Sequence, residues 1–95
     1  MKIPKTLKIG ATVYEVVRQS SDANGEKHLG YCNTGLAKIW IDSTAKQQVQ
    51  ESSLIHEILE AAKGGYCLEL EHQTLGTLAE VLYQVLRDNG MLRED

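Results

Sequence analysis

The stretch that most strongly constrains this 95-residue chain is Ser53-Leu54-Ile55-His56-Glu57-Ile58-Leu59-Glu60-Ala61. Its apolar residues recur at the three- and four-residue spacing of a helix with one buried face. His56 and Glu60 are four residues apart, so on a helix they lie one turn apart on the same side. Two ligating side chains at that spacing can bind one metal ion. The stretch therefore predicts a helix that carries part of a metal site.

These residues differ at one position from H-E-x-x-H, the helical signature in which two histidines hold zinc. In that signature the glutamate after the first histidine acts as general base on metal-bound water. Glu60 stands here in place of the second histidine. A carboxylate binds zinc at about the same distance as an imidazole, so His56 and Glu60 are candidate ligands and Glu57 is the candidate base. The competing interpretation is an ordinary helix pair of His56 and Glu60, worth about 0.2–0.5 kcal/mol.

The first forty residues are rich in β-forming side chains. Strands are expected at residues 7–10, 12–17, 30–33 and 37–42. The last of these has the clearest alternation, with Ile39 and Ile41 on one face. Asn24-Gly25 is a strong turn dipeptide within a polar segment. The pattern predicts a small antiparallel sheet of three or four strands.

Two helices are expected after the strands, at about residues 44–63 and 72–89. Asp42 or Ser43 can cap the start of the first helix, and Gly64-Gly65 is predicted to end it. Gly90 is predicted to end the second helix. A sheet followed by two packed helices makes a single α+β domain over residues 1–95.

A third metal ligand would come from the second helix. His72 lies at the rim of that helix's apolar face, so it can approach His56 and Glu60 if the two helices pack by their apolar faces. Glu80 reaches the same place less naturally and stays an alternative. Two imidazoles and one carboxylate suit zinc with one position left to water, and they also suit ferrous iron. The competing interpretation of His72 is a polar residue at a helix start.

Composition narrows the function classes. The formal net charge is −3 and the lysines and arginines are scattered, which argues against nucleic acid as the main partner. Cys32 and Cys67 form no C-x-x-C pair, and the first residues lack the apolar core of a signal peptide. No apolar run approaches the length of a membrane span. These features predict a cytoplasmic protein with reduced thiols.

Four segments carry a resemblance to a known family. They are residues 7–10, 39–42, 54–61 and 78–89. Together they resemble short phage and prophage proteins that look like minimal zincin metallopeptidases, with a layout similar to the core of the ImmA/IrrE and SprT-like peptidases. Many such proteins carry H-E-x-x-H-A at positions 56–61, and others resemble this chain in having H-E-x-x-E-A followed by a histidine that opens the last helix. The resemblance to the second group implies a metal site of His56, Glu60 and His72. In other zincins the third ligand is a glutamate on the following helix, for which Glu80 is the candidate.

Three functions compete at this stage. The leading hypothesis is a zinc-dependent, metallopeptidase-like hydrolase that acts on a peptide or protein, with the strand at 37–42 pairing with the extended substrate. The second is a zincin-shaped binding module without catalysis, acting on a host or phage protein. The third is a metal site that only stabilises a small domain. The oligomeric state is open, because the apolar faces of two helices and one sheet can cover each other within a monomer.

Overall fold

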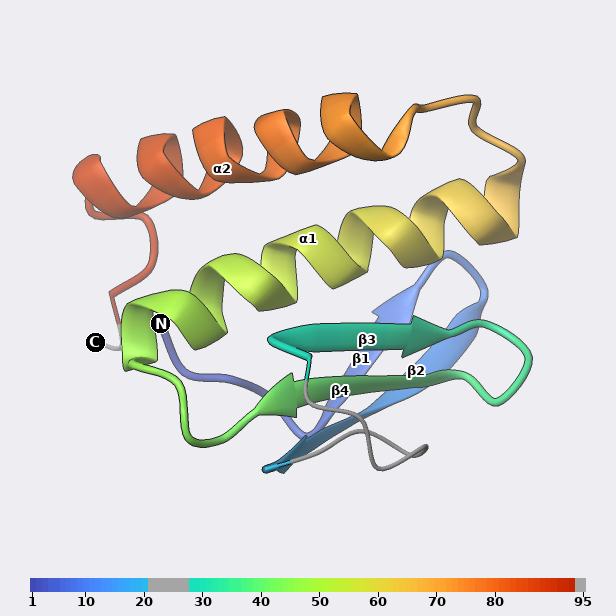
Figure 1. Cartoon of the computed structure of the whole chain (residues 1–95), viewed down its shortest axis with the longest axis horizontal. Helices are drawn as coiled ribbons and strands as arrows, with labels where there is room; N and C mark the ends of the chain where they lie inside the picture. The colour runs from blue at the N-terminus through green and yellow to red at the C-terminus, as the bar shows by residue number, and fades with distance from the viewer. Residues whose placement is uncertain (21–27, 94–95) are drawn as a thin grey trace.

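A computed structural model describes residues 1–20 and 28–93 of the chain. In these residues the elements follow the order β1 (Thr6–Ile9), β2 (Thr12–Gln19), β3 (Gly30–Asn33), β4 (Lys38–Asp42), α1 (Gln47–Tyr66) and α2 (His72–Asp88) (Figure 1). The predicted α+β class, with a four-stranded sheet followed by two helices, is therefore confirmed. The Asn24-Gly25 turn lies outside the described residues.

The sheet is mixed, whereas an antiparallel sheet was predicted. Its strand order is β1-β2-β4-β3. The β1–β2 and β3–β4 pairs are antiparallel, but the central pair of β2 and β4 is parallel. Turn residues in the sequence specify each two-stranded hairpin, because a short turn leaves antiparallel pairing as the only choice. Nothing local specifies which strand of the second hairpin lies against β2, so the parallel pair was not predicted.

The two helices form two further layers on one face of the sheet. Helix α1 lies across the sheet, and α2 lies on the side of α1 that faces away from the sheet (Figure 1). The core between α1 and the sheet consists of Tyr14, Val16, Ile39, Ile41, Leu54 and Ala61. A smaller core of Ile55, Ala79 and Tyr83 lies between the helices. Because α2 packs against α1 and against no described strand, its position depends on the contacts that α1 provides.

The ends of α1 differ from the prediction. Asp42 does not cap the helix; its carboxylate accepts hydrogen bonds from the backbone N–H of Thr44 at 2.9 Å and from its hydroxyl at 2.6 Å, in the turn that precedes the helix. At the other end, α1 continues through Gly64-Gly65 to Tyr66, and Cys67 takes the left-handed conformation with φ 56°. Gly64 serves close packing instead, because a Cβ atom there would lie 3.0 Å from Thr34 Cγ2.

Helix α2 agrees with the prediction to within one residue. It begins at His72, as expected, and ends at Asp88 with Asn89 as its C-cap residue. Gly90 follows with φ 70°, a left-handed conformation that glycine adopts without steric cost. Among the described residues, no helix combines the length and the apolar character that crossing a bilayer requires. The short segment from Cys67 to Glu71 connects the two helices, so its length limits where His72 can lie along α1.

Candidate metal centre

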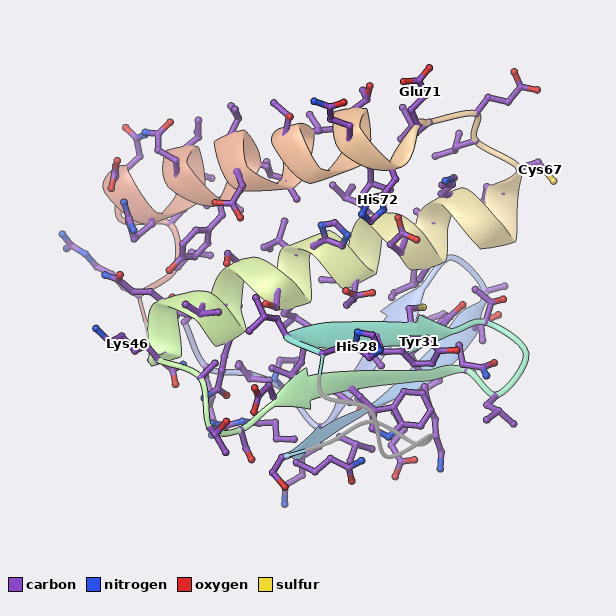
Figure 2. All side chains as sticks on the ribbon, in the orientation of Figure 1. His28, Tyr31, Lys46, Cys67, Glu71 and His72 are labelled. Atoms are coloured by element: carbon purple, nitrogen blue, oxygen red, sulfur yellow. The ribbon has the colours of Figure 1, made fainter. Side chains whose placement is uncertain are left out.

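Three of the predicted site residues come together between the helices. His56 and Glu60 lie one turn apart on α1, and His72 projects from the first turn of α2 toward α1 (Figure 2). The imidazole centroids of His56 and His72 are 5.6 Å apart, with the rings in an edge-to-face arrangement at 67°. One ligand atom from each of His56, Glu60 and His72 lies within 4.8 Å of the other two. This group could hold a metal ion.

The surroundings of Glu60 fit a bound cation. Its Oε1 atom is buried and has no hydrogen-bond partner in the part of the chain that the structure describes. An unsatisfied carboxylate oxygen away from water is costly unless a cation or a donor neutralises it. Zinc binds nitrogen and carboxylate ligands at about 2.0–2.2 Å, and the three ligand atoms of this group lie within 4.8 Å of one another. The donor set therefore fits a divalent metal.

Glu80 does not belong to this group. It is exposed on α2 and lines the same cleft, but the only cluster of three metal-ligating side chains among the described residues contains His72 instead. The sequence left both residues open as the third ligand. The geometry favours His72, because the first residue of α2 lies directly beside the middle of α1, whereas Glu80 is two turns further along.

Glu57 occupies a different side of α1 and is buried. Only 7% of its surface is exposed, and it faces the start of β3, where a Cβ atom on Gly30 would lie 2.9 Å from Glu57 Oε2. Burial, with a smaller repulsion from Glu60, raises the pKa of Glu57 to about 7, although His28 acts in the opposite direction. A carboxylate with such a pKa can accept a proton near neutral pH and release it again.

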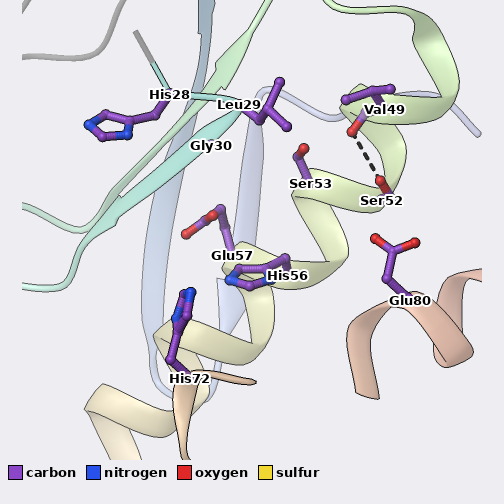
Figure 3. A pocket seen from close by; sticks show the side chains of 10 residues that line it. All are labelled: His28, Leu29, Gly30, Val49, Ser52, Ser53, His56, Glu57, His72 and Glu80. Atoms are coloured by element: carbon purple, nitrogen blue, oxygen red, sulfur yellow. Dashed lines mark hydrogen bonds between the residues drawn. The ribbon is translucent and has the colours of Figure 1, made fainter. Parts of the chain in front are cut away.

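His56, Glu57 and His72 border a cleft of about 550 Å³ between β3 and the two helices. Its walls are formed by His28, Leu29, Gly30, Val49, Ser52, Ser53, His56, Glu57, His72 and Glu80 (Figure 3). The segment before and at the start of β3 forms one wall, and α1 and α2 form the other. Glu60 does not line this cleft and borders a second hollow of about 280 Å³. The candidate metal ligands thus lie at the boundary between two concave regions.

Three features of the site were not foreseen from the sequence. Gly30 makes room for Glu57, and His28 lines the cleft. Cys32 lies half-buried on β3, where burial, followed by the charges of Glu57 and Glu60, raises the pKa of its thiol to about 11. Alternation along a strand could have put Gly30 and Cys32 on one face. Their position opposite α1 depends on tertiary packing that no local pattern specifies.

Tyr83 lies outside the site. It is 4% exposed, and its hydroxyl donates a 2.6 Å hydrogen bond to Glu51 Oε1 in the core between the helices. Glu51 also accepts a hydrogen bond from Gln47 at 3.1 Å and lies 3.4 Å from the amino group of Met1. This polar cluster joins α1, α2 and the start of the chain. Its role is to hold the helices together.

Comparison with protein-family models found no match to this chain, and no match was found among curated proteins or solved structures.

Proposed function

We propose that this protein is a zinc-dependent hydrolase of peptide bonds, with His56, Glu60 and His72 as metal ligands and Glu57 as general base. The observation that carries the proposal is the pairing of this ligand group with a buried glutamate one residue after the first ligand. Each feature alone is common in proteins of other function. Two histidine ligands and a carboxylate with a raised pKa on one cleft, beside a third ligand, are what metal-assisted hydrolysis requires.

Each residue has a separate part in the chemistry. A zinc ion at the triad would lower the pKa of water and polarise a peptide carbonyl. Glu57, whose burial raises its pKa in the metal-free protein, would accept the proton of the attacking water and deliver it to the leaving nitrogen. The burial of Glu57 against β3 holds its carboxylate beside the cleft.

The substrate would bind along β3. The strand that was expected to pair with substrate, β4, is central in the sheet and already pairs with β2 and β3, so that prediction was wrong. Strand β3 is the edge strand next to α1. Asp42 N–H donates to the carbonyl of Leu29 at 3.0 Å, so the alternation of an antiparallel pair directs the backbone groups of Gly30 and Cys32 away from β4. An extended peptide can pair with these outward-facing groups.

Metal content is the first test. Protein purified without a histidine tag should contain about one equivalent of zinc by elemental analysis. His56→Ala should abolish zinc binding, while an unchanged circular dichroism spectrum shows that the fold is retained. Zinc-loaded protein should cleave members of a mixed peptide library. Glu57→Gln should keep the zinc and lose turnover, whereas Glu80→Gln, a change to an exposed carboxylate on the same cleft, should keep both. Absence of bound zinc after incubation with excess metal would refute the proposal and leave the binding-module hypothesis.

One observation favours a second function, a structural metal site. Helix α2 contacts α1 and no described strand, so a metal ion shared by His72 and α1 would fasten α2 to the rest of the domain. Zinc would then raise the melting temperature, as a ligand that binds the folded state does. The two functions differ at Glu57. If the metal is only structural, Glu57→Gln leaves biological activity unchanged.

A further inference from the structure

Helix α1 and strand β3 run side by side in the same direction (Figure 1). Close approaches fix the alignment at both ends. A Cβ atom on Gly30 would lie 2.9 Å from Glu57 Oε2, and a Cβ atom on Gly64 would lie 3.0 Å from Thr34 Cγ2. Between these two points Cys32 and Glu60 border the second hollow. A peptide lying along the edge of β3 would therefore pass both Glu57 and this hollow, in an order set by the direction of the peptide.

The second hollow is separate from the cleft that holds Glu57. It has a volume of about 280 Å³ and is lined by Cys32, Thr34, Glu60, Lys63, Gly64 and Leu68. None of these residues except Glu60 belongs to the metal group. Side chains of ordinary size fit such a volume, so the hollow can accept one residue of a bound peptide.

The charges around the hollow favour an anionic group. The thiol of Cys32 lines the hollow and is mostly uncharged near pH 7, because even an unperturbed thiol has a pKa of about 8.5. Glu60 would be neutralised by a divalent ion shared with the two histidines. Lys63 is half-buried and makes no ion pair with the described residues. Its ammonium group is therefore the charge that remains for a ligand, with the Thr34 hydroxyl available as a hydrogen-bond donor.

The register of β3 says which peptide residue reaches the hollow. In an antiparallel pair, the residue opposite Cys32 directs its side chain to the same face of the sheet as Cys32 does. That face is the one covered by α1, because Cys32 packs against the core between α1 and the sheet. A peptide that pairs antiparallel to β3 runs in the direction from Cys32 toward Gly30. The residue paired with Cys32 then precedes the bond that lies beside Glu57.

We propose that the hollow between Cys32 and Lys63 is a substrate subsite for an acidic side chain on the N-terminal side of the scissile bond. This inference rests on the proposed function, since it uses the scissile bond to fix the register. Lys63 is the specificity-determining residue, and it lines the hollow together with Leu68. A basic side chain at the same position is disfavoured by Lys63.

The test measures peptide binding to the zinc-loaded Glu57→Gln protein, in which turnover is blocked. The probes are three acetylated and amidated alanine peptides that carry one central glutamate, glutamine or lysine. The glutamate peptide should bind roughly fivefold more tightly than the glutamine peptide, the ratio expected for one partly exposed ion pair. In ¹⁵N spectra it should shift the amide signals of Cys32, Thr34 and Gly64.

Variants at Lys63 give the matched comparison. Lys63→Met keeps most of the apolar stem and should remove the preference for glutamate, and Lys63→Glu should reverse it in favour of lysine. Lys46→Met, at the opposite end of α1 (Figure 2), should leave the preference unchanged. Equal binding of the three peptides, no binding of any, or a preference that survives in Lys63→Met would overturn the proposal.

Zinc content and library cleavage are measured on the wild-type protein in parallel. Glu57-dependent cleavage without an acidic preference would refute the subsite and retain the hydrolase. A Lys63-dependent preference for glutamate in a protein that binds no zinc and cleaves nothing would retain an acidic-peptide pocket and refute the hydrolase. The two failures are thus distinguishable.

Discussion

Replacing Glu57 by glutamine should stabilise the metal-free protein at alkaline pH. Glu57 is 7% exposed, and burial is the main reason why its pKa is raised from 4.5, the value of an unperturbed glutamate, to about 7. Glutamine has nearly the same shape but carries no charge. The substitution therefore removes the cost of holding an ionised carboxylate out of water and leaves the packing against Gly30 in place.

The magnitude follows from the pKa. Each pKa unit corresponds to about 1.4 kcal/mol, so the rise from 4.5 to about 7 costs the folded state about 3 kcal/mol once Glu57 is ionised. Below pH 4.5 the carboxyl group is protonated in both the folded and the unfolded chain, and this cost is absent. Between pH 4.5 and pH 7 the folded chain binds more protons than the unfolded chain, so the free energy of unfolding falls as the pH rises. Above pH 7 the full cost remains.

The assay is urea denaturation of both proteins in a chelator at pH 4.5 and pH 8, followed by circular dichroism. Glu57→Gln should be more stable than the wild type by about 2–3 kcal/mol at pH 8 and nearly equal to it at pH 4.5. Comparing two variants at each pH cancels the other titrating groups, and Glu80→Gln serves as the exposed control. A glutamine variant that is no more stable at pH 8, or that differs equally at both pH values, would refute the reasoning.

Three further predictions test the surroundings of the site. Tyr83→Phe removes the 2.6 Å hydrogen bond to buried Glu51 and should lower the free energy of unfolding by about 1–3 kcal/mol in urea melts. In Gly30→Ala the new methyl group should push the flexible carboxylate end of Glu57 out of place. We expect unchanged zinc affinity, nearly unchanged stability and a roughly 10- to 100-fold lower turnover in the library assay. Exposed Cys67 should react with iodoacetamide much faster than Cys32, whose pKa is raised to about 11. Mass spectrometry of the tryptic peptides after timed quenching measures both rates, and equal rates would contradict the assigned environment of Cys32.

The features that could be predicted from the sequence are local ones. Helix α2 begins at His72 as expected, and the four strands lie at the expected places in the described residues. The proximity of His72 to His56 followed from packing two apolar helix faces, which needs only the helical period and a short connection. In each case the prediction needs only the residue pattern within one element or within two elements joined by a short connection.

The features that were missed depend on packing between distant segments. The parallel pairing of β2 with β4 is decided by how two hairpins meet. Gly64-Gly65 was read as a helix end because glycine often follows a helix, yet close contact with Thr34 explains Gly64 within it. The burial of Glu57 depends on β3, which lies more than twenty residues earlier in the chain. The phage or prophage resemblance and the cytoplasmic location stay predictions.

The two glutamates of this helix turn give the strongest reason to look for function here. Glu57 is buried at a cost to stability, and Glu60 has a buried oxygen atom without a hydrogen-bond partner among the described residues. Glutamine at position 57, or an apolar residue at position 60, would relieve each problem without changing the helix. Local arrangements that oppose stability persist most often where a ligand or a reaction uses them. A divalent ion would satisfy Glu60 and weaken its repulsion of Glu57, so zinc should lower the pKa of Glu57 and stabilise the protein more at pH 8 than at pH 4.5.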